Sequence, residues 1–176
     1  MHLIYKVCKL SSVHHVDKEY EIAKILKKYL QKNTIIICIG TDKCIGDSLG
    51  PFVGTFLKDK DYPFDVYGTI ENPIHALNIR STLHQIETSY PDNNIIAVDA
   101  CLGDKKSIGE IHFRPHPIYP GKGVGKNLPK IGNASFIAIV ESINNSENYI
   151  SNNIRLDFII KMARTIEKIF WLALDL

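Results

Sequence analysis

The sequence has no long apolar run and no surplus of charge of one sign. Its apolar stretches fall well short of the roughly 18 residues that a membrane-spanning helix needs, and the polar start of the chain is unlike a secretory signal peptide. Lys and Arg together number 21 and Asp and Glu 19, which gives a net charge of +2. A field that weak does not favour nucleic acid or an anionic membrane. We therefore expect neither a membrane nor a nucleic acid as a partner.

Cysteine is also scarce, and the four cysteines form no CxxC pair. Closely spaced cysteines are typical of zinc sites and redox motifs, and disulfides are typical of exported proteins. The pattern predicts free thiols in a reducing cytoplasm. Basic residues gather at Lys122, Lys126 and Lys130 with few aromatic residues among them, which is atypical of a nucleic-acid surface.

The composition is that of an ordinary globular protein, with 45% apolar and 23% charged residues. Neither a repeat nor a linker divides the chain, so we predict a single domain over residues 1–176. Predicted strands alternate with predicted helices, which is typical of an α/β fold with helices on both faces of a mostly parallel sheet. A later hairpin-like pair of strands indicates that the sheet is mixed. The predicted architecture is a three-layer α/β/α sandwich.

The predicted elements follow from apolar periodicity and from turn and cap residues. Strands are expected over residues 2–8, 35–39, 65–70, 95–99, 108–113 and 135–140. Helices are expected over 17–30, from Asp47 to near residue 57, over 71–90 with Pro73 at the first helical position, and over 151–174.

The most informative stretch is Thr34–Pro51, which reads TIIICIGTDKCIGDSLGP. Its first residues are β-branched and apolar on both alternating faces, as in a strand buried on both sides in the middle of a parallel sheet. After Gly40 a polar loop leads to a helix, for which Asp47 or Ser48 suits the N-cap, with Pro51 in the first turn. This arrangement places a carboxylate at the carboxyl edge of the sheet, where open α/β folds have their sites.

Two carboxylates, Asp47 and Asp99, each follow a predicted buried strand and are expected at that same edge. If the two strands are neighbours, about 4.8 Å apart, the loop can fold Asp47 back over Asp99. Two carboxylates that close would share a proton near neutral pH. One could act as base on a water that attacks an amide carbonyl while the other donates a proton, with amides at the start of the Asp47 helix stabilising the oxyanion. The alternative is that Asp47 only caps its helix and Asp99 only ends its strand.

A phosphate-binding loop is a further alternative, because a strand, a glycine loop and a helix are also its setting. Gly40 and Gly46 bracket five residues, whereas the pattern GxxxxGK[ST] has four, and Asp47 stands where the lysine should be. A carboxylate at that position repels phosphate, so the sequence disfavours nucleotide binding.

Cysteine chemistry and metal binding also remain open. Cys44 lies in the loop after the central strand and Cys101 lies two residues beyond Asp99, so both thiols can face one cleft. A thiol nucleophile needs a nearby histidine. The candidates, which the sequence does not place, are His75, His112 and His116. Reduced thiols without a catalytic role are the favoured interpretation. A metal bound by Asp47, Asp99 and a histidine has no supporting spacing motif, so we expect no metal and no cofactor.

Residues 114–134 have no periodicity and are rich in Pro, Gly and Lys. A loop of that length inside a compact domain is usually functional or disordered. Within it, Tyr119–Gly132 reads YPGKGVGKNLPKIG, and the backbone amides of such a glycine-rich segment can line up against an extended peptide or an oxyanion. The alternative is a flexible surface loop.

Three segments together resemble a known family. They read IGTDKCIGDSLGP, IIAVDACLG and PGKGVGKNLP, and they resemble, in the same order, the YyaC-type sporulation proteases of endospore-forming Firmicutes. The likeness extends over residues 35–160. More distantly, the segments resemble the germination protease that degrades small acid-soluble spore proteins. The outline is similar to the hydrogenase maturation endopeptidases, which share the phosphorylase/hydrolase-like α/β/α fold.

The resemblance also implies site residues. Asp47 and Asp99 correspond to the two acids proposed for catalysis in the germination protease. The positions that fall on its glycine loop, and would bind the substrate, are Pro120, Gly121, Gly123, Gly125 and Asn127. In the hydrogenase endopeptidases the corresponding acids help to bind nickel together with a later histidine. No histidine of this chain, His116 included, can be matched to that third ligand.

The two acids and the free thiols predict a cytoplasmic peptidase that hydrolyses a peptide bond in a protein or peptide substrate with Asp47 and Asp99, and the resemblance implies that it is associated with sporulation. A role in spore germination is implied by the same resemblance, and a homo-oligomer is compatible with the sequence. The competing interpretation is a non-catalytic protein of the same fold that uses its cleft to bind a peptide or a metal.

Overall fold

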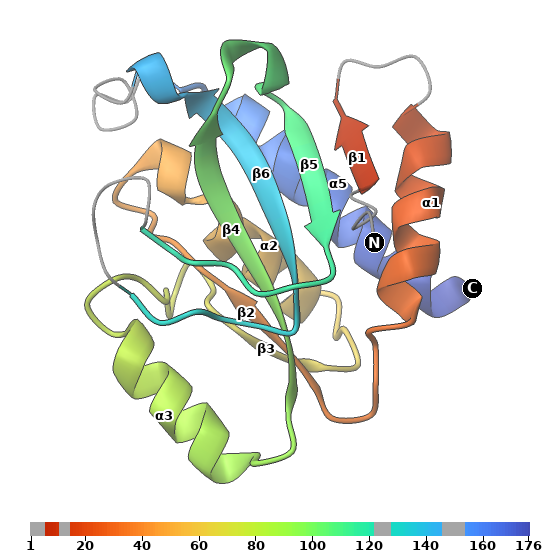
Figure 1. Ribbon diagram of the computed structural model, residues 1–176, viewed down its shortest axis with the longest axis vertical. Coiled ribbons are helices and arrows are strands. Elements are labelled where there is room, and N and C mark those ends of the chain that lie inside the picture. The colour runs from red at the N-terminus through yellow and green to blue at the C-terminus, as the bar shows by residue number, and fades with distance from the viewer. Residues whose placement is uncertain (1–5, 11–14, 122–127, 146–153) are drawn as a thin grey trace.

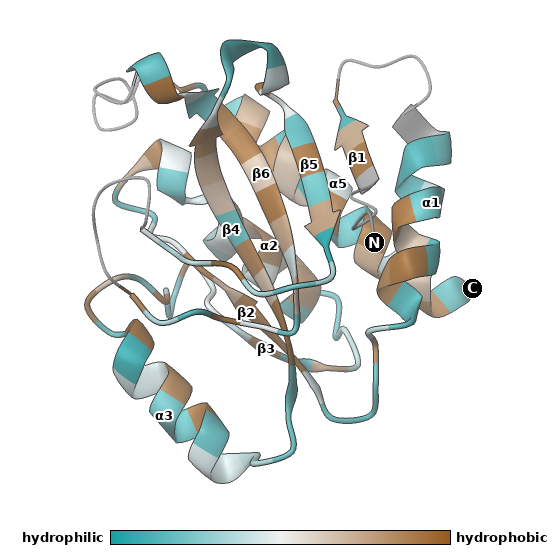
Figure 2. Ribbon diagram, viewed as in Figure 1, coloured by the Kyte–Doolittle hydropathy of each residue, from teal (hydrophilic) through white to brown (hydrophobic). Residues whose placement is uncertain are grey.

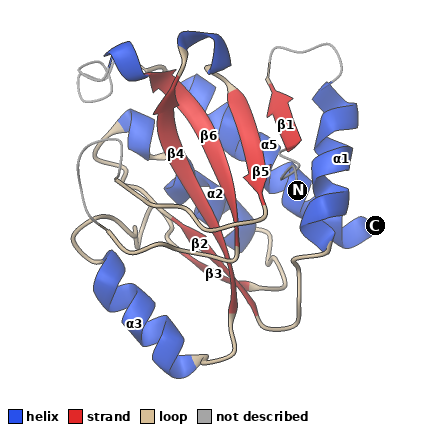
Figure 3. Ribbon diagram, in the orientation of Figure 1, coloured by secondary structure: helices blue, strands red, loops and turns tan. Residues whose placement is uncertain are grey.

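The computed structural model describes residues 6–10, 15–121, 128–145 and 154–176 (Figure 1). The strands are β1 (Lys6–Lys9), β2 (Thr34–Cys38), β3 (Asp65–Tyr67), β4 (Asn94–Gly103), β5 (Glu110–Arg114) and β6 (Ala134–Ser142). The α-helices are α1 (His15–Lys27), α2 (Leu49–Lys58), α3 (Ile79–Ser89) and α5 (Leu156–Asp175), and the 3₁₀ helices are η1 (Ile45–Asp47), η2 (Lys105–Ser107) and η4 (Ile143–Asn145). Strands and helices alternate from β1 to β4 (Figure 3).

The six described strands form one sheet in the order β1-β5-β6-β4-β2-β3. β2 pairs with β3 and β4, and β4 pairs with β6, all in parallel. β5 is antiparallel to both of its neighbours, β1 and β6, so among these strands it alone runs against the others (Figure 1). The sheet is therefore mostly parallel and mixed, as predicted.

Helices cover both faces of the sheet, which confirms the three-layer architecture. α1, α2 and α5 pack on one face and form the larger apolar cluster, which includes Phe113, Phe136 and Phe170. α3 packs on the opposite face through Ile79 and Ile86 in a smaller cluster. Apolar and polar residues alternate around these helices in Figure 2, as expected of helices with one buried side. None of the helices in the described ranges is long and apolar enough to cross a bilayer.

β2 is the buried central strand that the sequence predicts. Ile36 and Cys38 point into the larger cluster, whereas Ile35 and Ile37 point into the smaller one beside α3. Every residue of β2 is buried. Because both of its faces are covered, this strand has no alternation of polar and apolar residues.

The predicted helix over 71–90 begins later than expected, because α3 starts at Ile79. Residue Ile74 instead forms a parallel bridge to Ile39, just beyond the end of β2. Pro73 therefore precedes a short extended segment that prolongs the sheet. A proline fits an extended residue as well as a first helical residue, so its presence did not decide between the two.

Candidate active site

The loop after β2 closes back on itself at Gly40. Gly40 has a φ of +139°, and a Cβ at this position would lie 1.9 Å from the carbonyl oxygen of Asp47. The Thr41 N–H donates to the same oxygen at 3.0 Å. Only a glycine permits this approach of two backbone segments. The closed loop sets Asp47 beside the end of β2.

The helices η1 and α2 fix Asp47 further. Asp47 is the last residue of η1, whereas Ser48 is the N-cap of α2 and Pro51 lies in the first turn, so the interpretation of Asp47 as the helix cap is wrong. The Asp47 N–H donates to the Cys44 carbonyl at 3.0 Å, and the Ser48 N–H donates to the Ile45 carbonyl at 3.2 Å. Both amides are engaged inside η1, so neither of these two is available as an oxyanion donor.

Asp99 lies in the middle of β4, which corrects the predicted strand end at this residue. β4 continues beyond it because β6 pairs with β4 along that part, with Asp99 opposite Ile137. β2 pairs with β4 only as far as Cys38 opposite Val98. Asp99 therefore has a strand on one side and the end of β2 on the other, and η1, which carries Asp47, contacts β4.

The electrostatics place the two acids together. Burial raises the pKa of the Asp99 carboxyl well above its ordinary value, and the negative charge of Asp47 raises this pKa further, whereas a hydrogen bond with the backbone of Ala100 lowers it. Both acids keep some exposure to solvent. The structure thus brings together the two acids that the sequence singled out, and it favours a protonated Asp99 next to the charge of Asp47.

Cys101 follows Asp99 by two residues, so both side chains lie on the same face of β4. Burial raises the pKa of the Cys101 thiol to about 12, the charge of Asp99 adds to this rise, and the charge of Arg114 opposes it. Such a thiol stays protonated at neutral pH and is a poor nucleophile. All four cysteines are within the described residues, and none is joined in a disulfide. The structure therefore favours reduced thiols without a catalytic role.

β5 contributes polar residues to the same face that the sequence interpretation missed. Ile111 and Phe113 point into the larger cluster, so Glu110, His112 and Arg114 point to the opposite face, and all three are partly buried. His112 Nε2 lies 3.0 Å from Glu110 Oε2. The sequence shows the alternation of polar and apolar residues in β5, which indicates that one face of the strand is polar. It does not show the strand order, which places this face near Asp99.

The expected substrate loop is described only in part. Pro120 is buried, and Gly121 has a φ of +70°. Ile118 and Ile131 form an antiparallel bridge and are both buried in the smaller cluster, so the two ends of the loop are anchored to the sheet. The predicted positions that lie outside the described residues are Gly123, Gly125 and Asn127, the basic residues Lys122 and Lys126, residues 2–5 of the first strand and 151–153 of the last helix.

The part of the chain that the structure describes contains no group of three His, Cys, Asp or Glu side chains placed to hold a metal ion. The nickel site that the resemblance to the hydrogenase endopeptidases raised would need a histidine beside Asp47 and Asp99. His112 is instead bonded to Glu110. These residues do not fit that metal, and the mechanism below uses none.

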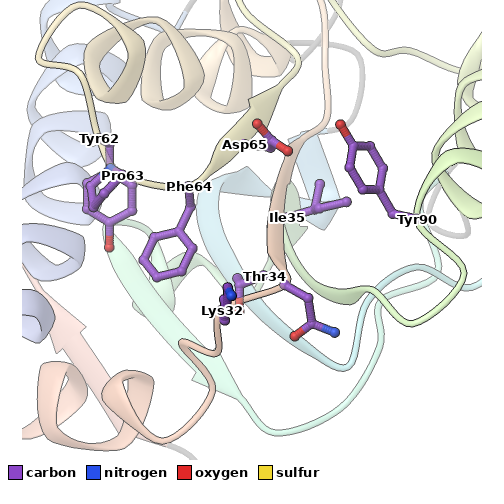
Figure 4. Close-up of a pocket in the computed structure, with 9 residues that line it drawn as sticks. Lys32, Thr34, Ile35, Tyr62, Pro63, Phe64, Asp65 and Tyr90 are labelled. Carbon is purple, nitrogen blue, oxygen red and sulfur yellow. The ribbon is translucent and has the colours of Figure 1, made fainter.

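Two hollows in the described structure lie away from the acid pair. The larger, of about 690 Å³, lies at the opposite edge of the sheet by the amino ends of β2 and β3, beside Phe64, Asp65 and Tyr90 (Figure 4). The other, of about 420 Å³, lies at the carboxyl end of β3. Neither is lined by Asp47 or Asp99.

The chain is similar to known proteins in sequence and in structure. Residues 12–169 match the family described as "Protein of unknown function (DUF1256)". The "Uncharacterized protein YyaC" of Bacillus subtilis (strain 168) is 38% identical over 146 residues, which are 82% of this chain and 71% of that protein. The crystal structure of a NiFe hydrogenase maturation protease, HycI, from Thermococcus kodakarensis KOD1 aligns with a TM-score of 0.47 and 16% identity, over 84% of this chain and 99% of that chain. The match over residues 12–169 and the identity to YyaC agree, and the chain belongs to the DUF1256 family.

Proposed function

We propose that this protein is a peptidase that hydrolyses a peptide bond with Asp47 and Asp99 as a paired acid–base unit. The observation that carries the proposal is that the loop closed at Gly40 sets Asp47 at the end of β2, beside Asp99 in the neighbouring strand β4, where burial and then the charge of Asp47 raise the pKa of Asp99. A carboxylate that serves only the fold is usually held by cations or hydrogen bonds, which lower its pKa. Paired acids with a raised pKa are typical of acid–base sites.

In the proposed mechanism Asp47 is the general base and Asp99 the general acid. The Asp47 carboxylate accepts a proton from a water molecule whose oxygen attacks the carbonyl carbon of the peptide. The protonated Asp99 carboxyl donates its proton to the amide nitrogen as the C–N bond breaks, which releases a carboxylic acid and an amine. Proton transfer from Asp47 to Asp99 then restores the starting state, and the proximity of the two acids supports that step.

The proposed substrate is a protein or peptide segment in extended conformation across β4 and β6. This position follows from Asp99, which lies in β4 opposite Ile137 of β6. We assign the holding of the peptide to the Tyr119–Gly132 loop, including Pro120 and Gly121. This assignment rests on the sequence resemblance and on the anchored ends of the loop.

The proposed setting is the cytoplasm of a sporulating cell, and the support is the resemblance of the sequence to spore proteases. Expression confined to sporulation, measured by immunoblot over a time course in the organism that carries this gene, is the expected result. Equal amounts of the protein in growing cells would contradict this part of the proposal without affecting the chemistry.

The peptidase activity is tested with the full chain and a library of peptides cut from proteins, with new termini read by mass spectrometry. We expect cleavage by the wild type and a loss of about a hundredfold or more in Asp47→Asn and in Asp99→Asn, because acid–base groups contribute about 10²–10⁴-fold to such reactions. Asp42→Asn is the matched control, since Asp42 is an exposed acid in the same loop, and it should keep full activity.

The competing function, a non-catalytic peptide binder, predicts a different result. Wild type would then cleave no peptide at any pH, while labelled peptides would still bind. Equal losses in Asp42→Asn and Asp99→Asn would also contradict the proposed mechanism, because the exposed acid has no part in it.

A further inference from the structure

The smaller of the two hollows lies close to the acid pair, at the carboxyl end of β3. It has a volume of about 420 Å³, and Gly68 and Ile74 form part of its wall. The Gly40 N–H donates to the Ile74 carbonyl at 2.7 Å, and Gly40 is also the residue at which a Cβ would meet the Asp47 carbonyl. Gly40 therefore contacts both Asp47 and the wall of the hollow.

The strand order gives the span between this hollow and Asp99. Only β2 lies between β3 and β4, and a Cβ on Gly68, the residue after β3, would lie 1.8 Å from the Cys38 carbonyl at the end of β2. Two strand spacings amount to about 10 Å, which is the length of about three residues of an extended chain. A substrate that crosses β6 and β4 and continues over the end of β2 thus reaches the hollow about three residues from the cleaved bond.

The partly buried polar groups of the hollow include both hydrogen-bond donors and acceptors. His75 Nδ1 accepts the Leu77 N–H at 3.3 Å, so the proton of the neutral ring is on Nε2, which is a donor. Thr69 Oγ1 accepts the Asn72 N–H at 3.1 Å. The Thr82 hydroxyl, which can donate and accept, forms no hydrogen bond with any residue that the structure describes.

Two exposed side chains of opposite charge, Lys58 at the end of α2 and Glu71 after β3, line the same hollow. Within the described ranges neither of them forms an ion pair or a hydrogen bond. An anionic ligand group would be repelled by Glu71, and a cationic group would be repelled by Lys58. A neutral group that has both a donor and an acceptor can bond to both residues without either repulsion.

We infer that this hollow is the subsite for a carboxamide side chain, Gln or Asn, of the substrate. This inference rests on the proposed function, of which it specifies the substrate class. A carboxamide has an acceptor oxygen and an NH₂ donor, which complement His75 and Thr82 inside the hollow and the two charges at its rim. An apolar side chain would cover these polar groups without bonding to them, which is unfavourable.

The test uses libraries of fluorescein-labelled decamers in which one position is Gln, Glu, Lys or Met and the other positions are randomised. Cleaved bonds are located by mass spectrometry. At one position about three residues from the cleaved bond, we expect wild type to prefer Gln over Met by about tenfold in kcat/KM, as for one or two hydrogen bonds. Equal cleavage of the Gln and Met libraries at every such position would overturn the inference.

Thr82→Val removes a hydroxyl at nearly constant shape and should reduce the preference for Gln by about threefold, mostly through KM, because one hydrogen bond is lost. Thr88→Val is the matched control. Thr88 lies on the same helix, donates its hydroxyl to the His84 carbonyl at 2.7 Å, and lines neither hollow. It should keep the wild-type preference. An unchanged preference in Thr82→Val, or an equal loss in both variants, would contradict the subsite.

The two rim charges predict a change of specificity when one of them is removed. Lys58→Met leaves the charge of Glu71 unopposed, so this variant should prefer the Lys library over the Glu library by about two- to fivefold, the range for exposed charge pairs. Glu71→Gln should have the opposite preference. Lys43→Met is the matched control, since Lys43 is an exposed cation that lines neither hollow. The same order of Lys and Glu in all three variants would overturn the role of the rim.

Binding separates this inference from the peptidase proposal. The affinity of Asp99→Asn for the Gln and Met libraries is measured by fluorescence anisotropy, with and without Thr82→Val. A preference for Gln in binding that Thr82→Val reduces, without cleavage by wild type, would sustain the subsite and sink the peptidase. Cleavage by wild type without any preference for Gln would do the reverse.

Discussion

At the scale of single residues, the raised pKa of Asp99 makes the free energy of unfolding depend on pH. The pKa of this carboxyl is higher in the folded chain than in the unfolded chain, so the folded state binds the proton more tightly. The contribution of Asp99 to the free energy of unfolding is therefore greatest in acid. It falls as pH rises from the ordinary carboxyl pKa of about 4 through the raised value. The group that the mechanism needs thus lowers stability at neutral pH.

Asp99→Asn should be more stable than wild type at pH values above the raised pKa of Asp99, because the amide carries no charge to bury. Melting temperatures of the two proteins, measured from acid to mildly alkaline pH, should converge at low pH and separate at high pH. Asp42→Asn should follow wild type throughout. A constant difference between Asp99→Asn and wild type at every pH would contradict this prediction.

Asp47→Asn should lower the pKa of Asp99, because the charge of Asp47 is one of the causes of its rise. The measurement compares the stability of Asp47→Asn with that of the double variant Asp47→Asn/Asp99→Asn across pH. The difference between them should develop at lower pH than the difference between wild type and Asp99→Asn. Identical pH profiles would mean that the two acids do not interact.

At the scale of the elements, the closed loop between β2 and α2 determines where Asp47 stands. The Cβ of an alanine at Gly40 would overlap the Asp47 carbonyl, and a Cβ at Gly50 would lie 2.1 Å from the Ile39 carbonyl. The first turn of α2 is thus pressed against the chain that leaves β2. The position of Asp47 therefore depends on two close backbone contacts, at Gly40 and at Gly50, that any side chain at these positions would block.

Gly40→Ala should displace the loop and reduce activity along with stability. Gly109→Ala is the matched control, because Gly109 also has a positive φ, +88°, but a Cβ there would meet only Phe158 at ordinary contact distance, 3.6 Å. The control should lose about 1–2 kcal/mol from backbone strain and keep its activity per folded molecule. Gly40→Ala should lose more stability than this and most of its activity, measured by urea unfolding and by peptide cleavage.

Comparison of the predicted and observed strands and helices shows which parts of the fold and of the site the sequence could predict. β2 and β4 were identifiable because their apolar runs suit strands buried on both faces, and Asp47 and Asp99 followed from them. The segment before α3 was misassigned, because the bridge from Ile74 to Ile39 joins residues far apart in the chain. The continuation of β4 beyond Asp99 depends on pairing with β6, which local patterns do not contain. The position of Arg114 required the strand order.

At the scale of the whole molecule, the face of the sheet that α1, α2 and α5 cover contains buried charges of its own. The face with α1, α2 and α5 holds buried carboxylates in ion pairs. Glu19 pairs with Lys168 at 2.6 Å, and Glu167 pairs with Lys60 at 2.7 Å and with Arg164 at 3.1 Å. Removing one member of a buried pair is costly, because the remaining groups lose a partner. These pairs stabilise the domain on this side, whereas Asp99 points to the other face, because Val98 and Ala100 beside it in β4 point into the larger cluster.

Glu167→Gln should reduce the free energy of unfolding by about 1–3 kcal/mol, as expected for charged hydrogen bonds lost at a buried site, while peptide cleavage per folded molecule stays unchanged. The matched control on the same helix is Asp157→Asn, since Asp157 forms an exposed pair with Lys161 at 2.9 Å. It should have no measurable effect, because exposed pairs contribute little. A fall in activity at full folding in Glu167→Gln would contradict the separation of the two faces.

The parallel pairing of β2 with β4 has a consequence for the newly made chain. Asp47 lies in η1 after β2 and Asp99 lies in β4, and parallel neighbours such as β2 and β4 need a long crossover connection between them. In a chain in which β2 and β4 have not yet paired, both acids are present but their charges do not yet act on each other. The proposed hydrolysis, which needs both acids together, would therefore require that β2 and β4 have paired.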